Sequence, residues 1–345
     1  MLDADWTDAN VLKVLGDRYR LDAYHVFPLR CSDSTAVAWH VECADASTVL
    51  VTQYLARDEL PAARRALGMS EFCRAAELSV PRVRPDRDGD LLCTLPDEGT
   101  LHGTCSVVDA DHGAGGLRPY TRDQAEHMGL ALGRMHQVLA GYPLPSQEPV
   151  GAERAWAVLC AADAVAAHEA ASVQIVARGA AARHVALALQ QIRRYLSTHL
   201  AELRGAVPAP KDLTAHAIHG QFMPPYVQAA TGLPVVSGFL ARTGYVAWEV
   251  ARAAFNPRTV AQGQDWQVRA LALLYSYHKA HEHFPVAELA ACPRLAALDM
   301  LCTPVSSAAP AEWERHVVAL RRLLDALPEL DEALRHLFSA PRRTV

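Results

Sequence analysis

The sequence predicts an α+β protein with two lobes, a small β-rich lobe over residues 1–98 and a large, mostly helical lobe over residues 99–345. Length is the first reason, because a single hydrophobic core stops growing near ~250–300 residues and this chain has 345. Patterning is the second reason. Strand-like runs gather before residue 96, whereas helical spacing of apolar residues dominates after residue 120.

The small lobe is expected to follow the order strand, strand, helix, strand, strand. Within residues 19–55, "AVAWHVECA" (36–44) and "STVLVTQYL" (47–55) are β-branched and aromatic runs around a polar turn at residues 45–47. Residues 58–78 predict a helix with a break at Gly68. Residues 80–96 predict a hairpin that turns at Asp88-Gly89.

The large lobe begins with "TRDQAEHMGLALGRMHQVLAGY" (121–142), in which Thr121 is placed to cap a helix. Residues 151–205 are almost entirely helical in pattern, and a short strand-like segment follows at 214–240. From Ala247 onward the pattern is helical again, with proline breaks expected near residues 257, 285, 293, 304 and 310.

Composition excludes several classes of function. The net charge of −5 provides no field that would recruit nucleic acid or an anionic membrane. The N-terminus lacks an apolar signal core, and no apolar run approaches the ~18 residues of a membrane span, so a cytoplasmic protein is expected. None of the eight cysteines forms a C-x-x-C pair, which argues against a zinc ribbon.

Three segments carry a resemblance to a known family. "LGRMHQVL" (132–139) resembles an LGxLH helix, "IHGQFMPPYV" (218–227) resembles a catalytic loop H-G-D-x-x-x-x-N, and 233–255 resembles an I-D-F-D strand followed by a D-L-A helix, matched by Glu249-Val250-Ala251. Together they are similar to the aminoglycoside phosphotransferase and choline kinase-like family. The resemblance implies a two-lobe, protein-kinase-like fold.

The charged residues of that family's chemistry are replaced in this chain. Phosphoryl transfer needs an acid for the acceptor hydroxyl and an amide and a carboxylate for Mg²⁺. By the resemblance those positions hold Gln221, Tyr226 and Ser237, and no Asp or Glu occurs between Thr214 and Trp248. No cofactor and no metal site are therefore expected.

The small lobe shows the same loss. The resemblance places the family's phosphate-binding lysine on the strand 47–55, where Gln53 or Thr52 stands instead. The loop expected over the phosphates, "RCSDST" (30–35), contains no glycine, although close backbone approach to a phosphate favours glycine. ATP–Mg²⁺ chemistry is accordingly expected to be lost.

Candidate site residues follow from the altered motifs. His219 is a candidate base and Tyr226 a candidate proton donor, with Gln221 beside them; in the alternative, His219 only braces the loop, as its family counterpart does. Candidates for substrate binding in the former nucleotide cleft are Gln53, Phe222 and Ser237.

Three functions remain open. The first is a repurposed fold that binds or modifies a peptide, as in phosphotransferase-like proteins of lanthipeptide and thioamitide biosynthesis, for example by closing a thioether ring on a dehydrated precursor. The second is a non-catalytic pseudokinase that scaffolds or regulates a partner protein. The third is an atypical small-molecule phosphotransferase.

Three other histidines have a spacing that could suit a metal site. His278, His281 and His283 lie in one helical stretch, and the first two have the i, i+3 spacing of a metal-binding pair. Pro285 ends that stretch, which favours a solvated helix end. The pair His168-Glu169 is predicted to lie on an exposed helix face.

Overall fold

The computed structural model describes residues 6–29, 36–95, 103–110, 120–144, 160–177, 182–223, 226–228, 234–305 and 310–339. The chain divides into two compact units. The N-terminal unit comprises Met1–Gly115, Tyr226–Ala230 and Pro234–Ala241, and the C-terminal unit comprises Gly116–Pro225, Thr231–Leu233 and Arg242–Val345. The segment 30–35, expected to cover phosphates, lies outside the described residues.

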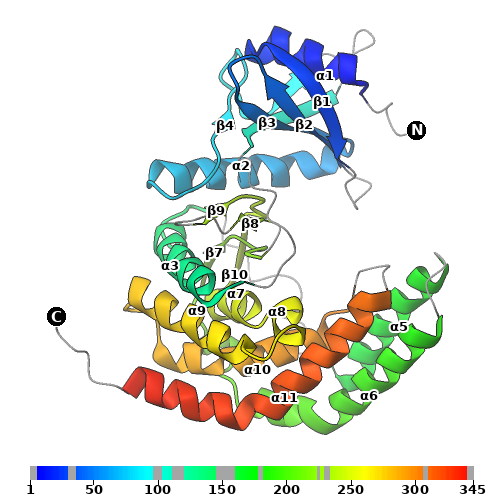
Figure 1. Ribbon diagram of the computed structural model, residues 1–345, viewed down its shortest axis with the longest axis vertical. Coiled ribbons are helices and arrows are strands. Elements are labelled where there is room, and N and C mark those ends of the chain that lie inside the picture. Colours follow the sequence, from blue (N-terminus) through cyan, green and yellow to red (C-terminus); the bar gives the residue numbers. More distant parts are fainter. Residues whose placement is uncertain are drawn as a thin grey trace. The chain divides into compact units, whose positions relative to one another are not determined.

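The N-terminal unit is built on an antiparallel sheet (Figure 1). Its strands are β1 (Ala23–Leu29), β2 (Ala36–Cys43), β3 (Thr48–Tyr54), β4 (Val83–Arg84), β5 (Cys93–Leu95) and β6 (Gly103–Asp109). They are arranged in the order β1-β2-β3-β6-β4, and β5 also pairs with β6. Two further short strands of this unit, β8 (Val227–Gln228) and β9 (Val235–Val236), pair with each other.

Helices cover this sheet. They are α1 (Asp8–Val14), continued by the π-helical turn η1 (Leu15–Tyr19), and α2 (Leu60–Ala75), preceded by the 3₁₀ turn η2 (Arg57–Glu59). Val11, Val14 and Leu15 pack into one core with the buried sheet residues Trp39 and Val51. A second cluster forms around Leu67, Val83 and Leu92. The α1 helix was not predicted from the sequence.

Two predictions for this unit are wrong. The α2 helix continues through Gly68, because the ~1 kcal/mol cost of a helical glycine is outweighed by burial of its neighbours Leu67 and Met69. Residues 80–96 do not form a hairpin, since β4 and β5 each pair with β6 and not with each other. Strand β6 instead pairs with β4 at Val107 and Val108 and with β5 at Gly103, Thr104 and Cys105.

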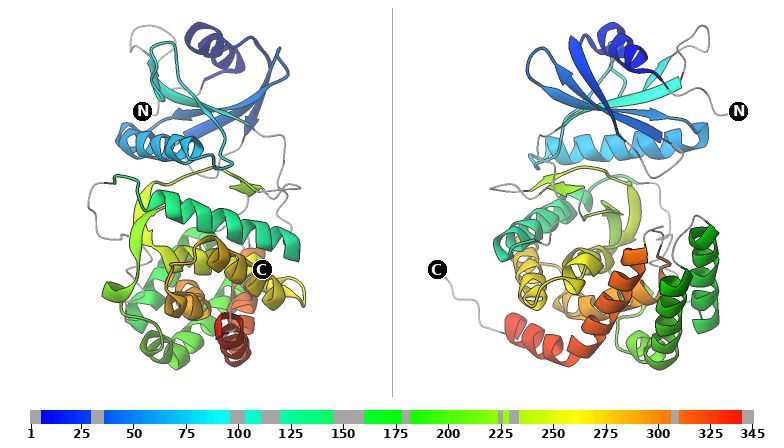
Figure 2. Two further views of the ribbon diagram at one scale, coloured as in Figure 1. Left: turned by 90° about the vertical axis from the view of Figure 1, so that its left-hand side faces the viewer. Right: turned by 45° about the vertical axis from the view of Figure 1, so that its right-hand side comes forward.

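The C-terminal unit is mainly helical (Figures 1 and 2). Its helices are α3 (Arg122–Leu139), α5 (Ala161–Ala177), α6 (Ala182–Gly205), α7 (Val246–Ala254), α8 (Pro257–Ala261), α9 (Trp266–Ala280), α10 (Val286–Cys302) and α11 (Pro310–Ser339), with a 3₁₀ turn η3 (Pro210–Asp212). Two short strands, β7 (Ala215–Ile218) and β10 (Arg242–Tyr245), pair antiparallel and bring Ile218 opposite Arg242. The α+β class expected from the sequence is confirmed.

The α3 and α9 helices pack at very close range, side by side in Figure 1. A Cβ atom on Gly129 would lie 2.2 Å from the carbonyl oxygen of Leu273, and one on Gly133 would lie 2.7 Å from the Ala280 Cβ. Only glycine leaves room for this approach. The N-terminus of α3 carries the expected cap, in which the hydroxyl of Thr121 accepts the Gln124 amide proton.

Two further predictions are wrong. Helix α10 continues through Pro293, which is itself buried, so packing on several sides outweighs the lost hydrogen bond. His168 is fully buried rather than exposed, and its Nε2 donates to the Leu301 carbonyl at 3.0 Å. Among the helices described, none is long and apolar enough to cross a membrane.

Candidate functional site

The segment that resembles a catalytic loop leaves strand β7 and is anchored at its first two residues by Glu249. This glutamate lies in the first turn of α7 and is 4% exposed. Its Oε2 accepts the backbone N–H of His219 at 3.0 Å, and its Oε1 accepts that of Gly220 at 2.6 Å. Gly220 has φ of 89°, a left-handed conformation that glycine adopts without steric cost.

A buried histidine completes this anchor from α3. His136, fully buried, donates from Nε2 to Glu249 Oε2 at 3.0 Å, and its Nδ1 lies 2.9 Å from the hydroxyl of Tyr277 on α9. Burial would raise the pKa of Glu249, but the hydrogen bond and attraction of His136, with help from His219 and the Gly220 amide, lower that pKa to about 2. The loop is therefore held by an ionised, fully paired carboxylate.

A second buried carboxylate holds the start of the same segment. Both oxygens of Glu288, on α10, accept the Thr214 amide proton at 3.1 Å, and Oε1 also accepts the Thr214 hydroxyl at 2.7 Å. Burial raises the pKa of Glu288. Residues 214–220 thus run between two carboxylates on different helices, which fixes the path of the chain into the loop.

The candidate residues His219, Gln221 and Phe222 all lie in the C-terminal unit. His219 is fully buried, and its Nδ1 accepts the backbone N–H of Gln221 at 3.0 Å. Phe222 is 2% exposed and contacts the His219 ring edge-on, with ring centroids 6.0 Å apart. These contacts brace the turn of the loop, while the partly exposed Gln221 is the one of the three that faces solvent.

The other candidates belong to the N-terminal unit. Ser237 donates its backbone N–H to the Tyr226 carbonyl at 2.8 Å, and the Tyr226 ring lies against Gly238, whose φ is +71°. Gln53, on β3, is 2% exposed, and its Oε1 accepts the Trp6 backbone N–H at 3.4 Å. Gln53 is therefore buried within this unit, with its acceptor in use.

The carboxylate that anchors this segment is not available as a ligand for Mg²⁺. The carboxylate nearest the loop, Glu249, is already engaged by three donors and buried, so it offers no open oxygen to a cation. Within the described ranges, no group of three or more His, Cys, Asp or Glu side chains is placed to hold a metal ion.

The histidines at the end of α9 pack against aromatic rings. His278 contacts Phe338 with ring centroids 5.2 Å apart, and His281 stacks on Tyr277 at 6.0 Å. Only His283 of the three is exposed. The expected solvated end therefore holds for His283, whereas helix packing partly covers the other two.

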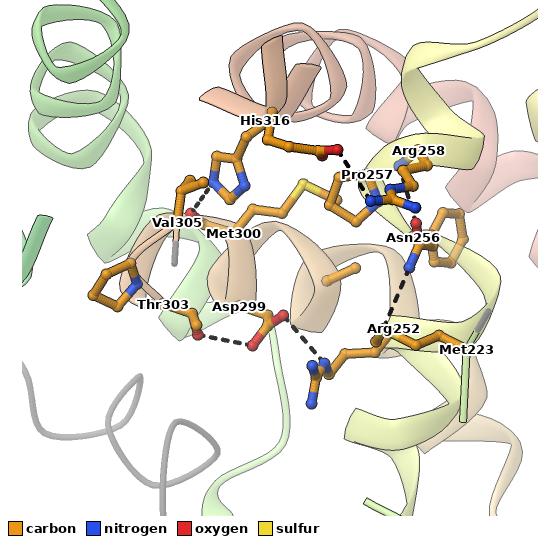
Figure 3. A pocket seen from close by; sticks show the side chains of 14 residues that line it. Met223, Arg252, Asn256, Pro257, Arg258, Asp299, Met300, Thr303, Val305 and His316 are labelled. Atoms are coloured by element: carbon orange, nitrogen blue, oxygen red, sulfur yellow. Dashed lines mark hydrogen bonds and ion pairs between the residues drawn. The ribbon is translucent and has the colours of Figure 1, made fainter. Parts of the chain in front are cut away.

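A cavity of about 280 Å³ lies in the C-terminal unit beside Met223, the last described residue of the loop (Figure 3). It is bordered by the end of α7, the start of α8, the end of α10 and the first turns of α11. Its lining combines an apolar floor, including Phe255 and Met300, with polar groups. Sequence reasoning missed this site, because its residues come from four elements and share no motif.

Comparison with solved structures defines the class of fold. A spectinomycin phosphotransferase in complex with ADP and spectinomycin matches with a TM-score of 0.60 and 9% identity, over 96% of this chain and 99% of that chain. An aminoglycoside phosphotransferase from Alicyclobacillus acidocaldarius matches with a TM-score of 0.60 and 11% identity, over 96% and 98%. A microcompartment-associated aminopropanol kinase matches with a TM-score of 0.57 and 16% identity, over 95% and 100%.

The chain therefore has the two-lobe, kinase-like fold of the aminoglycoside phosphotransferases and related kinases, as its motifs indicate. No protein-family model matches the sequence, and no curated protein gives a significant match. At these identities the likeness defines the fold, and the chemistry has to be argued from the residues of this chain.

Proposed function

We propose that this protein keeps the kinase-like scaffold but has lost phosphoryl transfer from ATP–Mg²⁺, and that it binds or modifies a peptide. One contrast carries the first half of the proposal. Both carboxylate oxygens of Glu249 anchor the loop by accepting its backbone N–H groups. The segment 214–248, however, contains no carboxylate that could hold Mg²⁺ or position an acceptor hydroxyl. The buried Gln53 at the lysine position supports the same conclusion.

The peptide half of the proposal follows from chemistry that needs neither ATP nor metal. In thioether ring closure, a base removes the cysteine thiol proton, the sulfur adds to the β-carbon of a dehydrated residue, and the resulting enolate takes up a proton. Electrons and protons balance without a cofactor. Neutral groups such as Gln221 and Tyr226 suit this addition better than they suit phosphate chemistry.

A non-catalytic pseudokinase that binds a partner protein is the second candidate, and one observation favours it. His219 is fully buried with its Nδ1 occupied by the Gln221 amide, which fits bracing better than proton transfer to a bound substrate. The third candidate, an atypical small-molecule phosphotransferase, is supported only by the similarity of the fold to that of solved small-molecule kinases.

Thermal shift with and without millimolar Mg-ATP, together with a phosphate-release assay, tests the first half. We expect no shift and no turnover, whereas a spectinomycin phosphotransferase run in parallel should be stabilised by mass action. A rise of several degrees, or turnover with any small-molecule acceptor, would favour the phosphotransferase instead.

Separate variants test the second half. Ring formation on a dehydrated peptide is followed for His219→Ala and Tyr226→Phe, alongside the melting temperature of each. For ring closure, Tyr226→Phe should lose activity while keeping its stability. Lost stability in His219→Ala combined with full activity in Tyr226→Phe would make both residues structural, and absence of ring formation by the wild type would favour the pseudokinase.

A further inference from the structure

The cavity beside Met223 contains an arginine with unused donors. Arg252, at the end of α7, contacts Asp299 Oδ2 through its Nε at 3.5 Å, and Asp299 is fixed in turn by the Thr303 hydroxyl at 2.9 Å (Figure 3). Across the described ranges, the two terminal nitrogens of Arg252 have no acceptor in the protein. The side chain is 29% exposed, so these donors are open to the cavity.

A second donor lies four residues further along the chain. Asn256 is 9% exposed, and its Oδ1 is occupied because it accepts the Arg258 amide proton at 3.0 Å and caps α8. The partner of its Nδ2 is the thioether sulfur of Met223 at 3.9 Å, a weak acceptor. Its amide N–H groups are thus almost unsatisfied at the wall of the cavity, and a buried donor without a strong acceptor is costly.

The carboxylates that line the cavity are both paired with arginines. Glu312 is paired with both Arg258 at 3.0 Å and Arg315 at 2.5 Å, and Asp299 is paired with Arg252. Both lining carboxylates are therefore neutralised by arginines, Glu312 in part by Arg315 from outside the lining, and neither is left unpaired to repel an anion at the donors of Arg252. His316, whose Nε2 donates to the Met300 carbonyl, adds no charge near neutral pH because burial lowers its pKa.

We propose that this cavity binds a carboxylate, held by the terminal nitrogens of Arg252 and by Asn256 Nδ2. A guanidinium presents two parallel N–H donors that match the two oxygens of a carboxylate. The apolar floor of Phe255 and Met300 then accommodates a small side chain or a methylene next to it. The cavity, at about 280 Å³, is of a size for the end of a peptide or for one small carboxylic acid.

This inference deepens the proposed function, because a peptide C-terminus carries such a carboxylate. The choice of a peptide as the ligand rests on the proposed function. A free small-molecule acid carries the same group. The two sources share one recognition chemistry and are separated by the ligands chosen for the test.

The experiment is a ligand-observed NMR titration of the full chain with N-acetylglycylglycine, its C-terminal amide, sodium propionate and inorganic phosphate. We expect saturable binding of the acetylated dipeptide and at least about tenfold weaker binding of the amide, since one charge-assisted pair is lost. Propionate binding as tightly as the dipeptide would assign the site to a small acid. Equal binding of the amide, tighter binding of phosphate, or no binding of any carboxylate would overturn the proposal.

Two conservative variants locate the site. Arg252→Lys keeps the charge but loses the paired donors, and Asn256→Asp keeps the helix cap but replaces a donor by a negative charge. Each should weaken carboxylate binding about tenfold or more. Arg252→Lys should leave the melting curve unchanged, whereas Asn256→Asp places a charge at a position only 9% exposed and should melt at a lower temperature. The matched control is Arg134→Lys, at an exposed position on α3, which should bind as the wild type does.

The variants also separate this inference from the proposed function. Wild-type binding by both pocket variants would overturn the carboxylate site, whatever the Mg-ATP test gives. Mg-ATP turnover by the wild type would overturn the loss of phosphoryl transfer and leave the carboxylate site standing as a site for an acidic acceptor.

Discussion

Removing the charge of Glu249 by Glu249→Gln should destabilise the C-terminal unit strongly. The carboxylate accepts three buried donors, from His219, Gly220 and His136. An amide of the same shape has one acceptor oxygen. If the amide oxygen takes the Oε2 position, it still accepts hydrogen bonds from His219 and His136. The NH₂ group of the glutamine then faces the Gly220 N–H, whose nitrogen lies 2.6 Å from Oε1 in the native protein.

The magnitude follows from these contacts. One unsatisfied buried donor costs about 1–3 kcal/mol, and two bonds that lose their charge-assisted strength cost about 1 kcal/mol each. The sum of roughly 3–5 kcal/mol agrees with the cost of breaking a buried ion pair. In a unit of this size it corresponds to a melting temperature lower by roughly 6–20 °C.

The pH dependence gives an independent measure. The folded-state pKa of Glu249 is about 2, below its ordinary 4.5, so its contribution to stability is fully present above pH 4.5 and is lost as the pH falls toward 2. That depression corresponds to about 3 kcal/mol. The difference in unfolding free energy between wild type and Glu249→Gln should therefore be largest near neutral pH and should shrink below pH 4.5.

Urea unfolding followed by circular dichroism at several pH values measures both effects. Glu126→Gln is the matched control, because Glu126 is a partly exposed residue on α3 in an i, i+4 pair with Arg122 and should change stability by less than about 0.5 kcal/mol. A Glu249→Gln variant within 1 kcal/mol of the wild type, or a difference that does not depend on pH, would refute the anchoring role.

Gly129→Ala should destabilise by at least about 1–3 kcal/mol, because its Cβ would meet the backbone oxygen of Leu273 at 2.2 Å, and backbone cannot move aside. Gly205→Ala, in α6, is the control in the same denaturation assay. A Cβ atom added there would have no neighbour within 4 Å among the described residues, so this variant should be neutral or slightly stabilising. Burial lowers the pKa of His168 from 6.5 to about 4. The neutral, buried side chain therefore contributes about 3 kcal/mol to the free energy of unfolding above pH 6.5, and this contribution is lost as the pH falls from 6.5 to 4. His168→Gln should flatten that part of the stability curve, and an unchanged slope would contradict a neutral, buried His168.

Much of the fold is readable from the sequence, because local patterns determine it. Alternation in "STVLVTQYL" locates β3, and the Thr121 cap with its following helical spacing locates the start of α3. The hypothesis that Gln221 and Ser237 stand in place of catalytic residues needs no structure either, since it comes from the resemblance to a short motif of fixed spacing. Local patterns failed where the choice of pairing partner decides, since β4 and β5 both pair with β6 and not with each other.

Only the tertiary structure shows what the retained residues do. Glu249 meets donors 30 and 113 positions earlier in the chain, and its depressed pKa exists because the fold buries it among them. His168 has the pattern of an exposed position, yet helix packing buries it against the Leu301 carbonyl. The unused donors of Arg252 and Asn256 become a site because four elements enclose them. Burial and hydrogen-bond satisfaction are properties of the packed chain, so residue types and spacing alone do not determine them.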